Sequence, residues 1–314
     1  MNRTDRREFI RNSMIAGAGV TAAIVSTGSA EGMSYGGPAS AKDRFSIGLI
    51  VGDKPERPPA EIAPGYEMSE MPISIQVLPL DTKAAWARKK AEFAAWKIPP
   101  PKVSSHYNPP GGRVLGPDID NELLDFWMAR SFARIAELGI EVVGVYGAFF
   151  EPPEGFPQTK ARDQALQFVN KLADHAKRYK MRIALEPMGE PKTLFPLYRD
   201  GVTFARQTGR PEICVMADTA YFVQREQPLE DIAKAPELCI HCQTAGVKGQ
   251  PGVGDLVELH TRLFRIFRDI KYKGAVSCAC PWVDTTGSGK LQFGIETAKT
   301  LKYLQDLRDK VYSE

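Results

Sequence analysis

The sequence predicts an α/β protein built as a closed (β/α)8 TIM barrel in which the first βα unit is irregular. From Phe45 onward, short apolar runs alternate with longer helical patterns, which is the order of repeated βα units. Eight such runs occur, and no linker divides them. Without an unusual N-terminal segment, the chain of 314 residues has the usual size of one barrel. We therefore expect one domain over residues 42–314.

Each predicted strand is a short run with the length of a buried strand. The first four are FSIGLI (45–50), GYEMSE (65–70), KVSSHYN (102–108) and EVVGVYGAFF (141–150). The last four are RIALE (182–186), ICVMAD (213–218), LCIHCQ (238–243) and GAVSCAC (274–280). Residues 51–65 are rich in proline and leave little room for a helix, which is why the first unit is expected to be irregular.

Three helices are predicted from apolar residues that recur three or four positions apart. They cover residues 119–138, with Gly139 as the stop signal, residues 161–179, and residues 255–270, with Asp255 as the N-cap. His175 lies in the second of these helices and His260 in the third. Both are expected at the surface, because amphipathic helices turn their polar residues outward.

Residues 1–41 resemble a twin-arginine export signal followed by a short linker. Arg6 and Arg7 precede a mildly apolar stretch over residues 14–30, which is too short and too rich in small residues for a stable membrane anchor. Cleavage after Ala30 or Ala41 would leave 284 or 273 of the 314 residues. We therefore expect an exported, periplasmic or extracellular protein whose transient partner is the twin-arginine translocase; a disordered tail is the alternative.

The composition is that of an ordinary soluble globular protein, with 43% hydrophobic and 25% charged residues. Residues 1–30 hold four arginines and two acidic residues, so their removal lowers the formal charge from +3 to +1. A nearly neutral protein lacks the basic surface that nucleic acid binding requires. The 5 cysteines are an odd number and do not indicate a disulfide framework.

Three predicted strands carry an acidic or imidazole side chain at or near their C-terminal end. These residues are Glu186, Asp218 and His241. In a parallel barrel such ends converge on one face, where active sites are built. Two carboxylates and one imidazole there are suitable ligands for a divalent metal ion. Each also has an alternative role: Glu186 in a structural ion pair, Asp218 as a helix N-cap and His241 in the core.

Four motifs occur in an order that resembles a known superfamily. They are YKMRIALEP, VMADTAY, CIHCQTAG and the closing segment PGVGDLVELHTRLFRIFRDIKYKGAVS. Over most of residues 44–310 this order resembles the sugar phosphate isomerase/epimerase superfamily of xylose isomerase-like TIM barrels. The resemblance implies that Glu186, Asp218 and His241 bind one divalent metal ion (Mn²⁺, Mg²⁺, Zn²⁺ or Co²⁺) and that Glu186 is the general base.

The chain departs from the family pattern at two positions. The family's fourth ligand, a glutamate on the last strand, is replaced by Ala279, and the histidine of its Asp-x-x-His motif is replaced by Tyr221. The family's epimerases use two glutamates as a pair of acid and base, so the resemblance leaves Glu186 without its counterpart. Cys278 or Cys280 is an alternative soft ligand at this place, and small apolar filling is the simpler interpretation of both.

Five residues are expected to bind substrate at the mouth of the barrel. They are His106, Tyr146, Tyr221, Lys248 and Trp282. Aromatic rings after the strands can stack on a sugar or simply fill the barrel. Relatives often carry a basic residue in the loop that holds Lys248, but a solvated loop lysine is equally consistent with the sequence.

These residues predict an exported, sugar isomerase/epimerase-like protein that acts on a sugar or polyhydroxy compound. One divalent metal ion would assist proton transfer, isomerisation or elimination. The first alternative is a catalytically degenerate barrel that binds carbohydrate, which the absence of the second glutamate favours. The second is a metal-dependent glycoside lyase or hydrolase.

Overall fold

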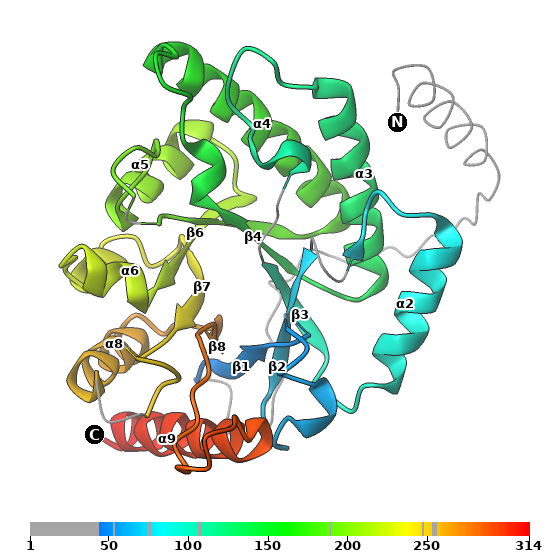
Figure 1. Ribbon diagram of the computed structural model, residues 1–314. Helices are drawn as coiled ribbons and strands as arrows, with labels where there is room; N and C mark the ends of the chain where they lie inside the picture. Colours follow the sequence, from blue (N-terminus) through cyan, green and yellow to red (C-terminus); the bar gives the residue numbers. More distant parts are fainter. Residues whose placement is uncertain are drawn as a thin grey trace, which may run out of the picture. The chain divides into compact units, whose positions relative to one another are not determined.

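The computed structural model describes residues 44–314 apart from residues 53, 74–76, 106–108, 189, 247 and 253–255. In this part, parallel strands close into a barrel in which each strand pairs with its neighbours in sequence and β1 pairs with β8 (Figure 1). The strands are β1 (Ser46–Ile50), β2 (Met68–Pro72), β3 (Pro101–Ser105), β4 (Val142–Tyr146), β5 (Arg182–Glu186), β6 (Ile213–Asp218), β7 (Cys239–Thr244) and β8 (Ala275–Cys278). The predicted (β/α)8 fold is confirmed.

Helices surround the described strands (Figure 1). The α-helices are α2 (Lys83–Ala95), α3 (Asn121–Glu137), α4 (Gln158–Tyr179), α5 (Tyr198–Thr208), α6 (Thr219–Gln224), α7 (Glu230–Ala233), α8 (Val257–Asp269) and α9 (Phe293–Ser313). The 3-10 helices are η1 (Pro59–Glu61), η3 (Pro110–Gly112) and η4 (Gly147–Phe150). The described residues between β1 and β2 form only η1, as the proline-rich sequence predicts.

Several strands are shorter than the apolar runs that predicted them. The run over residues 141–150 leaves the sheet after Tyr146, because η4 follows at once. The run over residues 65–70 enters it only at Met68, since Gly65 has a φ of 109° that no strand residue adopts. The end of the third run falls on residues 106–108, outside the described residues.

A plug of apolar side chains lies inside the barrel. It consists of Met68, Val103, Val142, Ala184, Met216 and Ala275. Side chains alternate along a strand, so the residue two positions later points into the same interior, one layer nearer the C-terminal ends. In β2, β5 and β6 these residues are Glu70, Glu186 and Asp218, and all three are buried. The plug therefore supports a layer of carboxylates.

His260 differs from its prediction: it is fully buried and not at the surface. Its Nε2 lies 3.1 Å from Thr244 Oγ1, and its Nδ1 lies 3.0 Å from the hydroxyl of Tyr303. The apolar face of α8 packs inward with Leu263 and Phe264, and these two hydroxyls give the imidazole polar partners there. The predicted N-cap of α8 is outside the described residues. His175, the other histidine predicted at the surface, is partly buried, and its ring stacks on that of Phe132 with 5.4 Å between the ring centroids.

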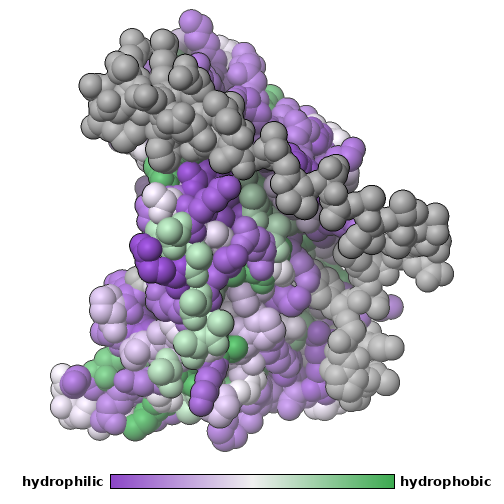
Figure 2. All heavy atoms as spheres, turned by 90° about the vertical axis from the view of Figure 1, so that its right-hand side faces the viewer, coloured by the Kyte–Doolittle hydropathy of each residue, from purple (hydrophilic) through white to green (hydrophobic). Residues whose placement is uncertain are grey.

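The outer surface is mostly hydrophilic in the face that Figure 2 shows, with hydrophobic residues in small groups. The large hydrophobic residues exposed in the described part are Leu80, Val223, Val257 and Ile295. None of the described helices is long and apolar enough to span a bilayer. The predicted export signal, including Arg6 and Arg7, falls outside the described residues, and the predicted domain boundary remains a prediction.

Candidate active site

A cavity of about 250 Å³ lies among the C-terminal ends of the strands. Five of the predicted site residues line it: Tyr146, Glu186, Asp218, Tyr221 and Trp282. The hydroxyls of Tyr146 and Tyr221 are 3.4 Å apart, so the two phenols form one polar edge of the cavity. Burial raises the pKa of both tyrosines above the usual value, and both therefore stay neutral hydrogen-bonding groups.

Two predicted site residues do not line the cavity, and a third is outside the described residues. His241 is fully buried and does not line the cavity. Lys248 is exposed to solvent and is not part of the cavity wall. His106 is one of the residues that the structure does not describe. The cavity thus contains the two predicted carboxylates and the aromatic residues, whereas the imidazole lies behind its wall.

His241 is held by a carboxylate that was not predicted as a site residue. Its Nε2 lies 3.0 Å from Glu70 Oε2, and Gln243 Nε2 donates to Glu70 Oε1 at 2.6 Å. Glu70 and His241 are both completely buried. Burial alone would raise the pKa of Glu70, but the adjacent His241 lowers it to about 2. In the neutral tautomer of His241 that donates to an ionised Glu70, the proton is on Nε2 and the lone pair is on Nδ1.

Glu186 and Asp218 are carboxylates that repel one another inside the barrel. Burial is the largest cause that raises the pKa of Glu186 well above its usual range, and the negative charges of Asp218 and Glu70 raise it further. Burial also raises the pKa of Asp218 to about 7, despite a hydrogen bond from the backbone N–H of Ala220. That bond measures 2.7 Å and makes Asp218 the N-cap of α6, so the alternative role of Asp218 is present in the structure. Only one carboxylate oxygen takes part in the cap.

The side chains present fit a divalent cation by their chemistry. Within the described residues, Glu186 Oε2 and His241 Nδ1 are buried polar atoms without a hydrogen-bond partner. Such atoms are costly unless a ligand or ion satisfies them, and a cation would also offset the repulsion between Glu186 and Asp218. In the part of the chain that the structure covers, however, no three His, Cys, Asp or Glu side chains already surround one point as metal ligands would.

Ala279 follows β8 and lines the cavity with Glu186 and Asp218. Ala275 belongs to the apolar plug, and side chains two and four positions later along a strand point to the same side. Strand alternation therefore directs Ser277 and Ala279 into the barrel as well. Cys278 and Cys280 also border the cavity but belong to the core between barrel and helices. Burial raises the pKa of the Cys278 thiol well above its usual value, so the thiol is neutral in the metal-free protein.

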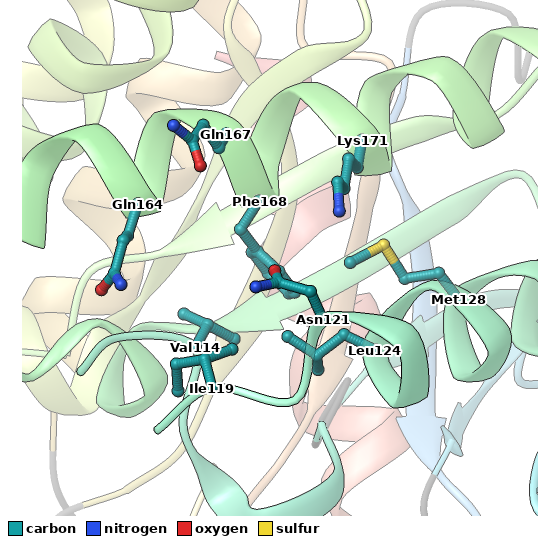
Figure 3. A pocket seen from close by; sticks show the side chains of 9 residues that line it. All are labelled: Val114, Ile119, Asn121, Leu124, Met128, Gln164, Gln167, Phe168 and Lys171. Carbon is teal, nitrogen blue, oxygen red and sulfur yellow. The ribbon is translucent and has the colours of Figure 1, made fainter. Parts of the chain in front are cut away.

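A second cavity lies on the outside of the barrel, between α3 and α4 (Figure 3). Its volume of about 50 Å³ holds no more than a few water molecules. Its only charged lining residue, Lys171, forms an ion pair with Asp125 at 2.7 Å. This hollow lacks the groups that catalysis needs, so the cavity at the strand ends is the candidate active site.

Four residues at or beside the site were not predicted from the sequence: Lys54, Arg57, Glu70 and Gln243. Glu70 had the same signal as Glu186, because it is the last residue of a predicted strand. Gln243 had it too, at the end of the seventh run. Lys54 and Arg57 lie in the proline-rich segment after β1, where no periodic pattern fixes which side chains turn inward.

Solved structures of sugar epimerases share this fold. A 3-keto-D-glucoside 4-epimerase from E. coli superposes with a TM-score of 0.62 at 16% identity over 86% of this chain and 100% of the epimerase. A D-allulose 3-epimerase from Methylomonas sp., solved with D-allulose, gives 0.64 at 14% identity over 84% and 97% of the two chains. The IolI protein with a bound zinc atom gives 0.59 at 12% identity over 86% and 98%.

At these identities the structures establish likeness of fold alone. No curated protein sequence matches this chain. Residues 119–305, more than half of the chain, match the family model described as "Xylose isomerase-like TIM barrel". This segment contains β4 to β8 and the strand ends that carry Glu186, Asp218 and His241. The chain belongs to the xylose isomerase-like TIM barrel family.

Proposed function

We propose that this protein is an exported sugar isomerase/epimerase-like enzyme that moves a proton at a carbon atom of a sugar or polyhydroxy compound. One observation carries the proposal. Glu186 is a buried carboxylate with an unsatisfied oxygen, and it lines a cavity bounded by aromatic rings and hydroxyls at the C-terminal ends of the strands. A carboxylate of raised pKa in such a cavity suits general base catalysis.

Glu186, Asp218 and His241 would hold one divalent metal ion, with His241 offering Nδ1. When bound, such an ion polarises a carbonyl or hydroxyl oxygen of the substrate. Glu186 takes the proton from carbon with the carboxylate oxygen that faces the cavity. Tyr146 and Tyr221 hydrogen-bond the sugar hydroxyls and orient the ring, and Trp282 excludes water from one side.

A single base favours isomerisation or elimination over epimerisation by two bases. A carboxylate on the opposite side of the reacting carbon is what an epimerase uses to return the proton, and Ala279 has none to offer. Removal of a proton by Glu186 and return of a proton by the same group to the neighbouring carbon needs only one carboxylate, and the proton on that carboxylate exchanges with solvent between the two steps. We accordingly expect no interconversion of common ketohexose epimers.

The second candidate function is carbohydrate binding without catalysis. Ala279 beside Glu186 in the cavity wall favours it, since the wall then lacks half of an epimerase's catalytic pair. Both functions need a sugar in this cavity, but only the first needs a reactive Glu186.

Proton exchange in heavy water separates the two functions. The purified protein with Mn²⁺ or Zn²⁺ is incubated in D2O with a panel of aldoses, ketoses and sugar acids, and NMR follows loss of carbon-bound protons. An enzyme exchanges at least one proton, and Glu186→Gln slows this exchange by about 100-fold or more while sugar binding persists. Binding without exchange in the wild type would refute catalysis and support the binding protein.

A further inference from the structure

The cavity is lined by basic residues as well as by the two acidic ones. Lys54 and Arg57 contribute to its wall, together with Glu186 and Asp218. Arg57 is only 8% exposed. A guanidinium buried to this degree needs polar partners, and its five N–H donors can serve both the rest of the chain and a ligand in the cavity.

One tight turn carries both basic residues. The backbone N–H of Arg57 donates to the carbonyl of Lys54 at 3.1 Å, which closes a turn with Pro55 at its second position. Pro58 follows directly, so fixed φ angles stiffen the segment on both sides of Arg57. The backbone positions of both basic residues are therefore fixed before any ligand arrives, which lowers the entropic cost of binding.

This turn lies across the barrel from Glu186. It follows β1, whereas Glu186 ends β5, and in the closed ring these two strands are four positions apart in either direction. The cavity consequently has an acidic side, where the chemistry is proposed, and a basic side. A ligand that spans the cavity meets both.

We propose that the substrate carries an anionic group at the end remote from the reacting carbon, and that the turn from Lys54 to Arg57 binds this group. The proposal rests on the proposed function, because it places the reacting carbon at Glu186. A carboxylate or a phosphate is the chemistry that fits, since both accept two parallel hydrogen bonds from a planar guanidinium. Arg57 has five N–H donors, so a contact to the protein still leaves donors for the ligand.

The size of the cavity limits the rest of the ligand. Its volume of about 250 Å³ is below the about 300–1,000 Å³ of pockets that take drug-sized molecules. A monosaccharide acid or a monosaccharide phosphate is the appropriate class, with Trp282 available to cover one face of the ring.

Calorimetric titration tests the proposal with matched ligands. For glucose, galactose and mannose, the neutral sugar, its uronate and its 6-phosphate are titrated into the full chain with Mn²⁺. We expect at least one anionic sugar to bind about tenfold or more tightly than its neutral parent. A preference for the uronate identifies a carboxylate as the recognised group, and a preference for the phosphate identifies a phosphate.

Variants then assign the preference to the turn. Arg57→Gln and Lys54→Gln each reduce it by about tenfold, whereas Arg88→Gln on the outer helix α2 leaves it unchanged. Lys54 is exposed, so its variant keeps the test valid if the buried Arg57 variant does not fold. The proposal is overturned if no anionic sugar is preferred, or if the preference survives both variants.

Failure of this proposal is distinguishable from failure of the proposed function. Proton exchange on a neutral sugar without any anion preference refutes only the anion site. Anion preference that depends on Arg57, without proton exchange on any ligand, leaves the anion site intact and refutes catalysis.

Discussion

Glu70 accepts hydrogen bonds from two buried side chains, so its substitution tests how the interior of the barrel is held. Glu70→Ala removes both acceptors and leaves His241 Nε2 and Gln243 Nε2 without partners, at sites that are 0% and 2% exposed. Breaking a buried ionic or hydrogen-bonded pair from one side costs about 3–5 kcal/mol. We therefore expect Glu70→Ala to lower the free energy of unfolding by about that amount.

Glu70→Gln separates stability from metal binding. Its amide oxygen still accepts from Gln243, and its NH₂ group donates to His241 Nε2, provided that the imidazole proton moves to Nδ1. The cost in stability is then less than about 2 kcal/mol. Nδ1 becomes a donor, however, and no longer offers a lone pair, so we expect metal affinity to fall by about 10- to 100-fold.

Urea unfolding followed by circular dichroism measures the free energy of unfolding. Calorimetric titration with Mn²⁺ measures the metal affinity, and ¹⁵N NMR of the imidazole reports the tautomer of His241. Glu141→Ala is the matched control: its ion pair with Lys102, at 2.7 Å, is about 40% exposed at both ends and contributes about 0–1 kcal/mol. An alanine variant at position 70 that costs no more than this control would refute the reasoning on stability. A glutamine variant that keeps full metal affinity would refute the assignment of Nδ1.

Three further predictions concern the carboxylates and the export signal. Folding raises the pKa of Asp218 to about 7, so the folded protein keeps a proton that the unfolded chain releases near pH 4. The metal-free protein should therefore lose stability as pH rises from about 4 to about 7. A melting temperature that does not change over this range would contradict the prediction. Ala279→Glu adds a carboxylate to the cavity wall and should tighten metal binding about tenfold in a calorimetric titration; unchanged affinity would mean that position 279 does not reach the ion. Replacement of Arg6 and Arg7 by lysine should leave unprocessed precursor inside the cell, as seen by fractionation, and normal export would exclude the twin-arginine route.

Local patterns determine most of this fold, because each βα unit is predicted from its own periodicity. The same patterns placed Glu186 and Asp218 at strand ends, which is where the cavity forms. They misplaced His260, since periodicity does not reveal that Thr244 and Tyr303, from elements distant in sequence, provide the polar partners that let a histidine be buried.

Contacts across the barrel were beyond prediction for the same reason. Glu70 satisfies His241 over 171 positions in sequence, and no pattern within either strand indicates the pairing. Arg57 lies in an irregular segment whose turn, and not a repeating pattern, directs the side chain to the cavity. Sequence patterns therefore do not identify site residues whose neighbours come from remote parts of the chain.

The pairing of β1 with β8 has a consequence for the order of events during synthesis. Ser46 lies opposite Ala275 in this pair, so the seam of the barrel joins residues at nearly the two ends of the described chain. Until β8 leaves the ribosome, β1 and β7 each present an unpaired edge, and such edges invite association with other chains. Nascent forms of this protein should therefore depend on chaperone protection up to the last stage of translation, and a ribosome stalled before β8 should expose an aggregation-prone intermediate.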